Sequence, residues 1–363
     1  MSWEEPPSPY IQRHLAHLGV RAIERGTVTP ERMMTMMTSA VGQTSSEIIY
    51  EENKLEVHRY EPDEQRFATP ICLVYALVNR PYILDLQPDR SVIKALLEAG
   101  FEVYLIDWGE PSRLDTALGL EDYVCRYIDN CVATICDRAG VESVHLLGYC
   151  MGGSLAIMYA SLFSDNVRTL SAMATPVVFD ETGGLLERWA RFYDPKTVTE
   201  TYGNVPAELL ASQFALMEPV ENLLSKYIRF FENIEDEDFV EMFARMERWT
   251  WDGVDVAGRV FREFVDDVYR NNRLIEGEIS LGGETVTPSE LTVPLLQIVG
   301  TQDHIVPPES STVLNNVVAT DDEHIVEFPA GHIGISVSGR AHSELWPEVC
   351  SWLGQRSVPK HTE

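Results

Sequence analysis

Short apolar runs alternate with amphipathic segments along most of the chain, and this alternation predicts strands interleaved with helices. The apolar runs suited to buried strands span residues 69–75, 102–106, 144–147, 169–175, 293–300 and 324–328. Helical spacing of apolar residues occurs at 91–99, 122–139, 154–162 and 341–353. This order predicts right-handed crossovers and a mostly parallel sheet flanked by helices, which is the α/β class.

The N-terminal part of the chain departs from this alternation. Residues 9–40 have the apolar spacing of a helix, and we expect residues 1–45 to form a helical segment. Residues 47–50 and 55–60 are strand-like and are joined by a short polar connection, which predicts a β-hairpin.

A second departure lies between residues 177 and 273, where the chain is helical in pattern and rich in aromatic side chains. A segment of this length is too long for a loop. We therefore expect residues 177–273 to form a helical cap, or lid. It would be inserted into a catalytic core that comprises residues 46–176 and 274–357.

Acidic residues dominate the charge of the chain: 57 Asp and Glu residues stand against 28 Lys and Arg residues, and the formal net charge is −29. Such a charge argues against binding to nucleic acid or to anionic membranes. Only five of the basic residues are lysines, so arginine carries most of the positive charge. Two interpretations remain, an ordinary acidic protein or an adaptation to high internal salt. We favour the second, because salt screens carboxylate repulsion and an acidic surface maintains solubility.

Targeting and cofactor signals are sparse. No apolar run approaches the roughly 20 residues of a membrane helix, and the acidic start of the chain does not resemble a signal peptide. We therefore expect a cytoplasmic protein.

Six cysteines in 363 residues do not indicate a disulfide framework. The sequence has no zinc-finger spacing, glycine-rich phosphate loop or dinucleotide fingerprint, so we expect chemistry without a metal or bound cofactor.

The most informative stretch joins a predicted strand to a predicted helix through Gly148–Tyr149–Cys150–Met151–Gly152. A sharp strand-to-helix turn strains its central residue and leaves little room for flanking side chains, which explains the glycines. Cys150 would lie at the helix N-terminus, where the helix dipole favours a thiolate. A lone cysteine is usually a small buried apolar residue, and we apply that interpretation to the other five. The pattern instead favours Cys150 as a nucleophile, in the position that serine occupies in the elbow of α/β-hydrolases.

Two later strands end near residues that can complete a nucleophilic triad. Asp303 follows the fifth apolar run, and His332 follows the sixth. The order nucleophile, acid, histidine is that of α/β-hydrolases, and the carboxyl ends of parallel strands share one edge of a sheet. We predict that His332 is the general base for Cys150 and that Asp303 orients its imidazole. His304 is a weaker alternative, and His145, on the elbow strand, is expected to be structural.

An oxyanion hole requires two backbone N–H groups. One is expected from Met151, the residue after the nucleophile. The other is expected from the loop after residues 69–75, where Leu77 and Val78 are the candidates. We choose Val78, a choice that depends on the register of that loop.

These motifs together resemble the PhaC catalytic subunits of class III polyhydroxyalkanoate (PHA) synthases, within the α/β-hydrolase superfamily. The matching stretches are residues 75–86, 107–109, 148–153, 174–177, 269–274, 300–307 and 331–334. The resemblance spans residues 46–353. The short N-terminal part and the sequence Ala76–Pro81 resemble class III chains, and the acidic bias resembles halophile members. The chain departs from the commoner form of the elbow at Tyr149.

The resemblance implies an α/β-hydrolase fold and an acyltransferase activity. Cys150 would accept a short 3-hydroxyacyl group from a coenzyme A thioester such as (R)-3-hydroxybutyryl-CoA and release coenzyme A. A hydroxyl activated by His332, with or without help from Asp303, would then attack the acyl-enzyme and extend the polyester. Coenzyme A is part of the substrate, so no separate cofactor is implied. The resemblance also implies a PhaE-like second subunit, an oligomer, and a location on the surface of cytoplasmic PHA granules.

Two alternatives belong to other functional classes. One is a hydrolase with a cysteine nucleophile, of the dienelactone hydrolase or PHA depolymerase type. The other is a non-catalytic protein that coats granules. Release of coenzyme A together with polymer formation separates the synthase from both.

The charge imbalance predicts that thermal stability rises with salt. Self-repulsion among carboxylates weakens as the screening length falls from about 10 Å at about 0.1 M to about 3 Å at about 1 M ionic strength. We therefore expect the melting temperature to rise between low and molar potassium chloride, measured by circular dichroism. A melting temperature that stays flat or falls over this range would contradict the salt-adaptation interpretation.

Overall fold

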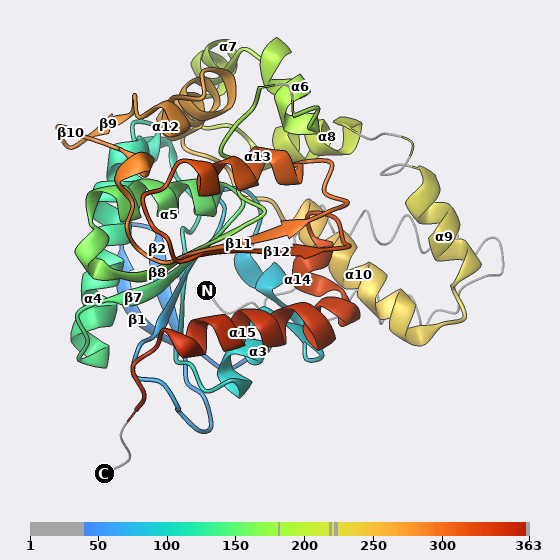
Figure 1. Cartoon of the computed structure of the whole chain (residues 1–363). Coiled ribbons are helices and arrows are strands. Elements are labelled where there is room, and N and C mark those ends of the chain that lie inside the picture. Colours follow the sequence, from blue (N-terminus) through green and yellow to red (C-terminus); the bar gives the residue numbers. More distant parts are fainter. Residues whose placement is uncertain (1–39, 181, 218–219, 221–223, 361–363) are drawn as a thin grey trace.

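The computed structural model describes residues 40–180, 182–217, 220 and 224–360 (Figure 1). The helix expected at residues 9–40 therefore lies almost entirely outside the described residues. Residues 40–46 form irregular chain, in which Val41 is buried, and lead into the first strand.

An eight-stranded sheet forms the centre of the molecule, with the strand order β1-β2-β6-β3-β7-β8-β11-β12. β1 and β2 form the expected hairpin, and β2 also pairs antiparallel with β6. The other neighbours pair in parallel. The strands are β1 Glu47–Glu52, β2 Leu55–Tyr60, β3 Ile71–Val74, β6 Val103–Asp107, β7 Val144–Tyr149, β8 Val167–Met173, β11 Leu295–Gly300 and β12 Glu323–Phe328. The mostly parallel sheet predicted from the apolar runs is confirmed.

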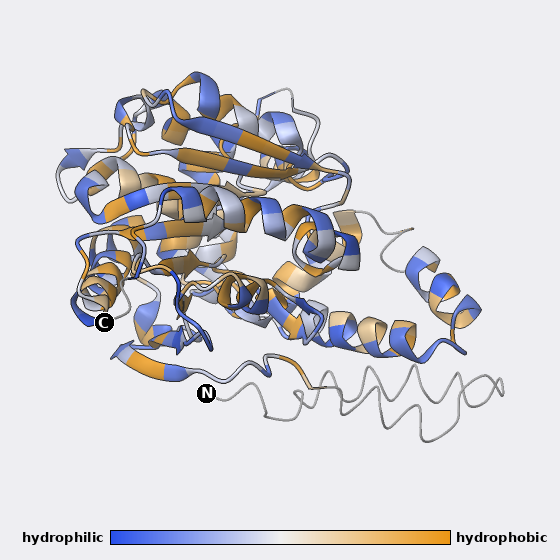
Figure 2. Cartoon of the chain, turned by 60° about the horizontal axis from the view of Figure 1, so that its bottom comes forward, coloured by the Kyte–Doolittle hydropathy of each residue, from blue (hydrophilic) through white to orange (hydrophobic). Residues whose placement is uncertain are grey.

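Helices cover both faces of this sheet, with α3 and α15 on one face and α4 and α5 on the other (Figure 1). Their bounds are α3 Val92–Glu98, α4 Asp129–Ala139, α5 Met151–Leu162 and α15 Trp346–Gln355, and the π-helical turn η3 Asp122–Ile128 leads into α4. The central strands are largely apolar, whereas most helices alternate apolar and polar residues (Figure 2). This difference follows because the strands are buried on two faces and helices such as α4 and α15 on one; α5 is the exception, since it is buried along nearly its whole length. Within the described ranges, no helix has both the length and the apolar character needed to cross a membrane.

Sequence periodicity did not predict the short elements, because so few residues do not complete a recognisable repeat. Two small antiparallel pairs are formed by β4 Asp85–Gln87 with β5 Arg90–Ser91, and by β9 Ser280–Leu281 with β10 Glu284–Thr285. The short helices are η1 Pro81–Leu84, η2 Arg113–Asp115, η4 Ser164–Asn166, η7 Pro288–Glu290, α13 Pro308–Thr312, η8 Val313–Asn316 and α14 Gly334–Val337. The helix expected at residues 341–353 is present as η9 Ala341–Leu345, which leads directly into α15.

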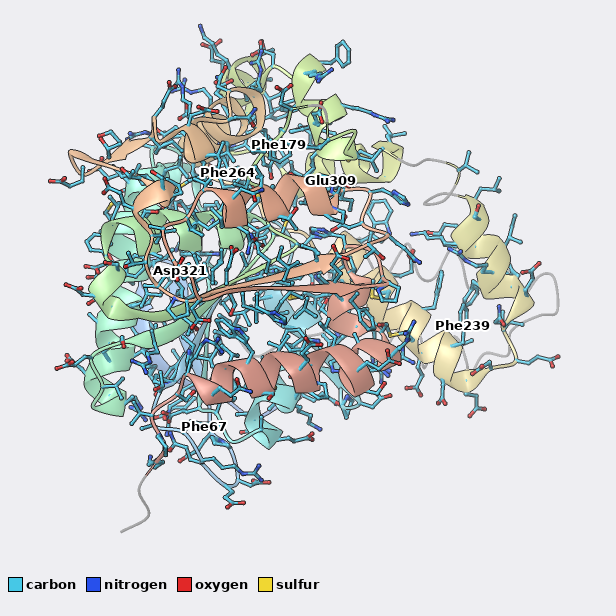
Figure 3. All side chains as sticks on the ribbon, in the orientation of Figure 1. Phe67, Phe179, Phe239, Phe264, Glu309 and Asp321 are labelled. Atoms are coloured by element: carbon cyan, nitrogen blue, oxygen red, sulfur yellow. The ribbon has the colours of Figure 1, made fainter. Side chains whose placement is uncertain are left out.

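A helical insertion, defined here as residues 185–276, separates β8 from the last two strands of the sheet. It comprises α6 Leu185–Phe192, α7 Pro195–Tyr202, α8 Ala207–Met217, α9 Lys226–Glu232, α10 Glu237–Trp251, α11 Gly258–Glu263, η6 Phe264–Arg270 and α12 Arg273–Glu276. α9 and α10 project from the side of the molecule (Figure 1). This pair has a small apolar core of its own, formed by Phe230, Ile234, Val240 and Ala244. Phe239 packs against that core, whereas Phe264 is buried in the main core (Figure 3).

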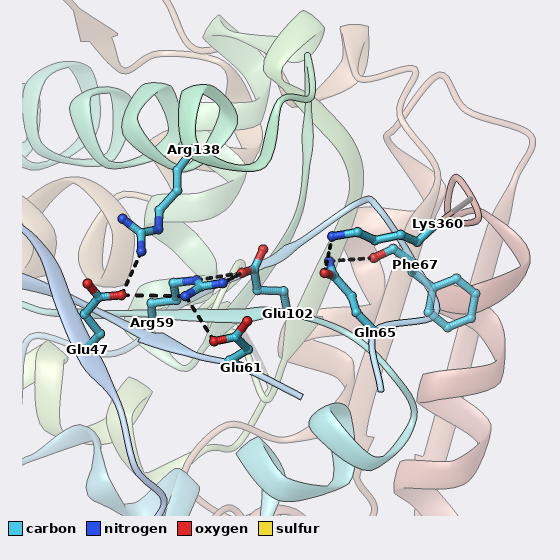
Figure 4. Close-up of polar contacts among 8 residues, drawn as sticks. All are labelled: Glu47, Arg59, Glu61, Gln65, Phe67, Glu102, Arg138 and Lys360. Carbon is cyan, nitrogen blue, oxygen red and sulfur yellow. Dashed lines mark hydrogen bonds and ion pairs between the residues drawn. The ribbon is translucent and has the colours of Figure 1, made fainter. Parts of the chain in front are cut away.

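A network of ion pairs lies at the amino end of β6, away from the edge that carries the predicted triad (Figure 4). Glu102, immediately before this strand, is buried and accepts a hydrogen bond of 2.6 Å from Arg59 Nε. The same arginine pairs with Glu61 at 3.3 Å, and Arg138 pairs with Glu47 at 2.7 Å. Arginine, which is scarce in this acidic chain, therefore stabilises the buried Glu102 carboxylate. Burial of an unpaired carboxylate would cost several kcal/mol or more of free energy.

The turn between β7 and α5, called here the elbow, is closely packed against β3 and the end of β8. Cys150 at its centre has φ 55° and ψ −126°, a conformation that side-chain-bearing residues seldom adopt. A Cβ atom at Gly152 would lie 2.1 Å from the carbonyl oxygen of Val74, and one at Gly153 would lie 1.8 Å from Thr175 Oγ1. The glycines therefore allow α5 to begin directly beneath the neighbouring backbone.

Gly152→Ala is expected to destabilise the protein by about 1–3 kcal/mol, because the added methyl group overlaps a backbone carbonyl that is held within the sheet. Gly339→Ala is the matched control, because a Cβ atom there meets nothing within 4 Å. Thermal unfolding at fixed salt should show a lower melting temperature for the first variant and little change for the second. Equal melting temperatures would contradict the close packing of the elbow.

Candidate active site

Cys150 lies between the last residue of β7 and the first residue of α5, at the carboxyl edge of the sheet. Its backbone N–H donates to the carbonyl of Met173 at 2.9 Å, and its own carbonyl accepts from Gly153 N–H at 2.9 Å. These bonds on both sides hold the residue in its strained conformation. The thiol is half-buried and faces a cavity, so a small substrate can reach it.

Asp303 and His332 form a direct hydrogen-bonded pair at the same edge. The distance between Asp303 Oδ2 and His332 Nδ1 is 2.6 Å. The other carboxylate oxygen, Oδ1, accepts the backbone N–H groups of Ile305 and Val306, each at 2.9 Å. The acid is therefore fixed by its own loop, and it holds one imidazole nitrogen so that the other is available to Cys150.

Opposing effects act on the protonation of His332. Burial disfavours the charged imidazolium, but the Asp303 carboxylate and the nearby Cys150 sulfur outweigh it and raise the pKa of His332 well above its ordinary value. The imidazole can therefore retain a proton at neutral pH. His332 is therefore placed to exchange a proton with the Cys150 thiol during attack.

The other two histidines considered from the sequence lie elsewhere. The side chain of His304 is exposed, while its backbone carbonyl accepts a hydrogen bond from Leu185. His145 is buried, with Nδ1 2.8 Å from Thr169 Oγ1 and Nε2 2.7 Å from Ser357 Oγ. Burial lowers the pKa of His145 to about 3, so this residue is neutral and links β7 to the end of the chain.

Met151 and Val78 both line the cavity beside Cys150. Met151 is the first residue of α5, where a backbone N–H group has no carbonyl of a preceding turn to bind. Val78 lies in the loop between β3 and η1, called here the β3 loop, and the next residue, Asn79, has φ 60°. The assignment of these two N–H groups to an oxyanion hole remains our prediction.

The helical insertion is hydrogen-bonded to the β3 loop. Trp249 Nε1 of α10 donates to the carbonyl of Arg80 at 2.9 Å. Just beyond α10, Asp252 Oδ2 accepts from the Tyr82 hydroxyl at 3.0 Å. The position of α10 is thus linked to the loop that carries Val78, a link between distant segments that sequence reasoning missed.

A cavity of about 520 Å³ extends from Cys150 and His332 into the helical insertion. Its aromatic lining includes Trp189, Phe243, Trp249, Trp251, Phe264 and Tyr269. Among its polar residues, Lys226 and Glu247 pair at 2.6 Å and so neutralise each other. The cavity is large enough for a small acyl group and is poor in groups that would hold water.

One group of side chains within the described ranges has the composition of a metal site. Donor atoms of Glu56 and His58 on β2 and of Asp107 at the end of β6 lie within 4.8 Å of one another. Glu56 and Asp107 are register partners, and His58 lies two residues along the same strand. None of the three lines the cavity, so they are not part of the catalytic constellation. Glu56 and His58 are two residues apart on a predicted strand, so the sequence indicated that they share one face. The sequence did not indicate that this strand pairs with β6, which brings Asp107 next to them.

Comparison with known proteins decides the family. A family model described as alpha/beta hydrolase fold matches residues 69–338, and one described as the N-terminus of poly-beta-hydroxybutyrate polymerase (PhaC) matches residues 24–96. The chain is 53% identical over 350 residues to the poly(3-hydroxyalkanoate) polymerase subunit PhaC of Haloferax mediterranei, covering 96% of this chain and 71% of that one. It is 42% identical over 329 residues to the subunit of the same name from Allochromatium vinosum, covering 90% and 93%. The chain belongs to the PhaC family. The resemblance inferred from its motifs is therefore confirmed.

Solved structures confirm the fold of this PhaC family member. A monoacylglycerol lipase from Paleococcus ferrophilus matches with a TM-score of 0.51 at 21% identity, covering 83% of this chain and 100% of the lipase. A monoglyceride lipase from Saccharomyces cerevisiae matches with a TM-score of 0.54 at 13% identity, covering 88% and 97%. At such identities the likeness establishes the α/β-hydrolase fold alone.

Asp303→Asn is expected to lower the pKa of His332. The carboxylate raises that pKa against the effect of burial, so a neutral amide leaves burial to dominate. The pKa of His332 in the folded protein lies above its unfolded value of about 6.5. The Asp303–His332 interaction therefore contributes fully to the free energy of unfolding below about pH 6.5, and this contribution is lost as pH rises through the folded pKa. The stability deficit of the variant should therefore be largest at acidic pH and shrink at alkaline pH, as measured by thermal unfolding.

The same variant should react about tenfold more slowly with iodoacetamide at Cys150 near neutral pH, because an imidazole that has lost its Asp303 partner is less able to take the proton of the thiol. Peptide mass spectrometry distinguishes this thiol from the others. Asp321→Asn is the control, because it removes one negative charge from an exposed turn (Figure 3). If the two variants behave alike, the Asp303–His332 pair does not control the thiol.

Proposed function

We propose that this chain polymerises (R)-3-hydroxyacyl groups from coenzyme A thioesters into polyhydroxyalkanoate, through an acyl-enzyme on Cys150. The single observation that carries the proposal is the hydrogen-bonded Asp303–His332 pair beside a strained cysteine at an apolar cavity. The family supports the same activity, since its named relatives are poly(3-hydroxyalkanoate) polymerase subunits.

In the first half-reaction, the Cys150 sulfur attacks the carbonyl carbon of the thioester. The bond between that carbon and the sulfur of coenzyme A breaks, and His332 supplies the proton that leaves with the free thiol. Backbone N–H groups of Met151 and Val78 stabilise the charged oxygen of the tetrahedral intermediate. The exchange replaces one thioester by another, so it needs no further co-reactant.

In the second half-reaction, His332 takes the proton of a 3-hydroxyl group, and that oxygen attacks the acyl-enzyme carbonyl. A new ester forms, the bond to sulfur breaks, and the proton returns to Cys150. Asp303 holds the imidazole and stabilises its charged form. A well-oriented hydroxyl can compete with water, because effective molarities for placed groups reach about 10⁵ M or more, and the aromatic cavity keeps water scarce.

The finer assignments form part of the proposal. We divide the chain into a catalytic core, residues 46–176 and 274–357, a cap, residues 177–273, and an N-terminal segment, residues 1–45. The relatives are named as subunits, which supports a multi-subunit enzyme, and we propose a PhaE-like partner, an oligomer and a cytoplasmic location at the granule surface. A short acyl chain such as 3-hydroxybutyryl suits the volume of the cavity.

Cys150→Ala is expected to abolish polymer formation and release of coenzyme A from 3-hydroxybutyryl-CoA, measured with a PhaE-type subunit supplied. Loss of one thiol removes the covalent route but little buried volume. Cys125→Ala is the control, because Cys125 is also half-buried and does not line the cavity. Polymerisation by a folded Cys150→Ala protein would exclude this cysteine as the nucleophile.

Butyryl-CoA, which lacks the 3-hydroxyl group, separates the synthase from the alternatives in the same assay. A synthase should release one equivalent of coenzyme A and stall, with a butyryl group on the peptide that contains Cys150. Steady conversion to free butyrate would identify a hydrolase. Absence of any acylation, with no polymer from 3-hydroxybutyryl-CoA, would identify a non-catalytic granule protein.

A further inference from the structure

Tyr149, the residue before the nucleophile, contacts His332 in two ways. Its hydroxyl donates a hydrogen bond of 2.9 Å to the backbone carbonyl of His332. Its ring also stacks on the imidazole, with a centroid separation of 5.5 Å and an interplanar angle of 29°. One side chain therefore holds both the backbone and the ring plane of the same histidine.

This contact connects parts of the sheet that no strand pairing joins. Tyr149 ends β7, whereas His332 follows β12, and β8 and β11 lie between these two strands. A small rearrangement across two intervening strands would change the distance between the histidine and Cys150. The hydrogen bond from Tyr149 joins the two residues more directly, because Tyr149 is bonded to Cys150 in the chain and contacts His332 without any intervening strand.

The tyrosine also touches the other side of the site. Its ring meets the ring of Tyr75 edge to face, with centroids 5.7 Å apart, and Tyr75 begins the β3 loop that carries Val78. Tyr149 is 2% exposed, and burial raises its pKa well above the ordinary value. The hydroxyl therefore remains protonated and able to donate over the whole range in which the protein is folded.

We propose that Tyr149 is a positioning residue that aligns His332 with Cys150, an inference that rests on the proposed function for its catalytic consequence. Asp303 fixes the Nδ1 end of the imidazole, and Tyr149 fixes the plane of the ring and the loop behind it. Three contacts from the ends of two strands, β7 and β11, thus define the direction of the remaining nitrogen. Displacement of a catalytic group by about 1 Å can cost about a hundredfold in rate, so the tyrosine, which lines the cavity beside Cys150, is proposed to act on turnover through the position of His332.

Two variants separate the hydrogen bond from the ring contact. Tyr149→Phe keeps the ring and removes the donor, and kcat is expected to fall about threefold to tenfold, the equivalent of one neutral hydrogen bond. Tyr149→Leu removes both contacts, and kcat should fall about a hundredfold. In Tyr149→Phe, KM for 3-hydroxybutyryl-CoA should change less than about twofold, because the ring that lines the cavity beside Cys150 is retained.

Tyr159→Phe is the matched control. Tyr159, on α5, is also buried and does not line the cavity. Its hydroxyl donates a hydrogen bond of 3.1 Å to Asp129 Oδ1, at the start of α4. Loss of that hydroxyl should lower the melting temperature but leave kcat unchanged. If Tyr159→Phe lost as much kcat as Tyr149→Phe, the loss would be a consequence of lower stability in general, and the proposal would be overturned.

Alkylation of Cys150 by iodoacetamide over a pH series provides a readout that does not require polymerase activity. Misalignment of His332 should shift the alkylation profile of Tyr149→Phe away from that of the unmodified chain, which Tyr159→Phe should match. A shifted profile supports the positioning role even if the polymerase assignment fails. An unshifted profile together with unchanged kcat in Tyr149→Phe would overturn the role while leaving the polymerase assignment intact.

Discussion

The close approach of α5 to β3 is the constraint on which the site depends. The helix begins at Met151, directly after a residue with positive φ, and Gly152 lies where a side chain would overlap the carbonyls of Val74 and Tyr75. This approach brings the helix N-terminus, the nucleophile and the start of the β3 loop together. The backbone strain at Cys150 is sustained because hydrogen bonds to β8 and within α5 hold the turn on both sides.

Around this elbow, His332, the proposed general base, is held from several directions. Asp303 is fixed by two backbone N–H groups and in turn holds His332 Nδ1, while Tyr149 holds the carbonyl and the ring plane of the histidine. The charge of the imidazolium is balanced by a carboxylate in a buried site, where such a pairing is worth more than at the surface. The three residues proposed to be catalytic, which follow or end β7, β11 and β12, are therefore aligned by side-chain contacts as well as by the sheet.

The helical insertion supplies the remaining requirement, a cavity beside the thiol that is lined mostly by apolar and aromatic side chains. Two charged residues of the lining, Lys226 and Glu247, pair with each other. Because Trp249 and Asp252 are bonded to the β3 loop and its flank, displacement of α10 acts on the same loop that carries Val78. Enclosure of the acyl group and the geometry of the carbonyl site are thus physically connected.

The sequence by itself determined the order of the main strands and helices, the elbow and the identity of Cys150, Asp303 and His332 as candidates. These features are local: they follow from apolar periodicity, from glycine spacing, and from the rule that parallel strands end at one edge. Only the tertiary structure decided the stacking of Tyr149 on His332, the bond from Trp249 to Arg80, and the meeting of Glu56, His58 and Asp107. Each of these contacts joins side chains from segments that are distant in the chain. Local patterns carry no information on such pairings, because register and loop conformation are set by the packing of the whole core.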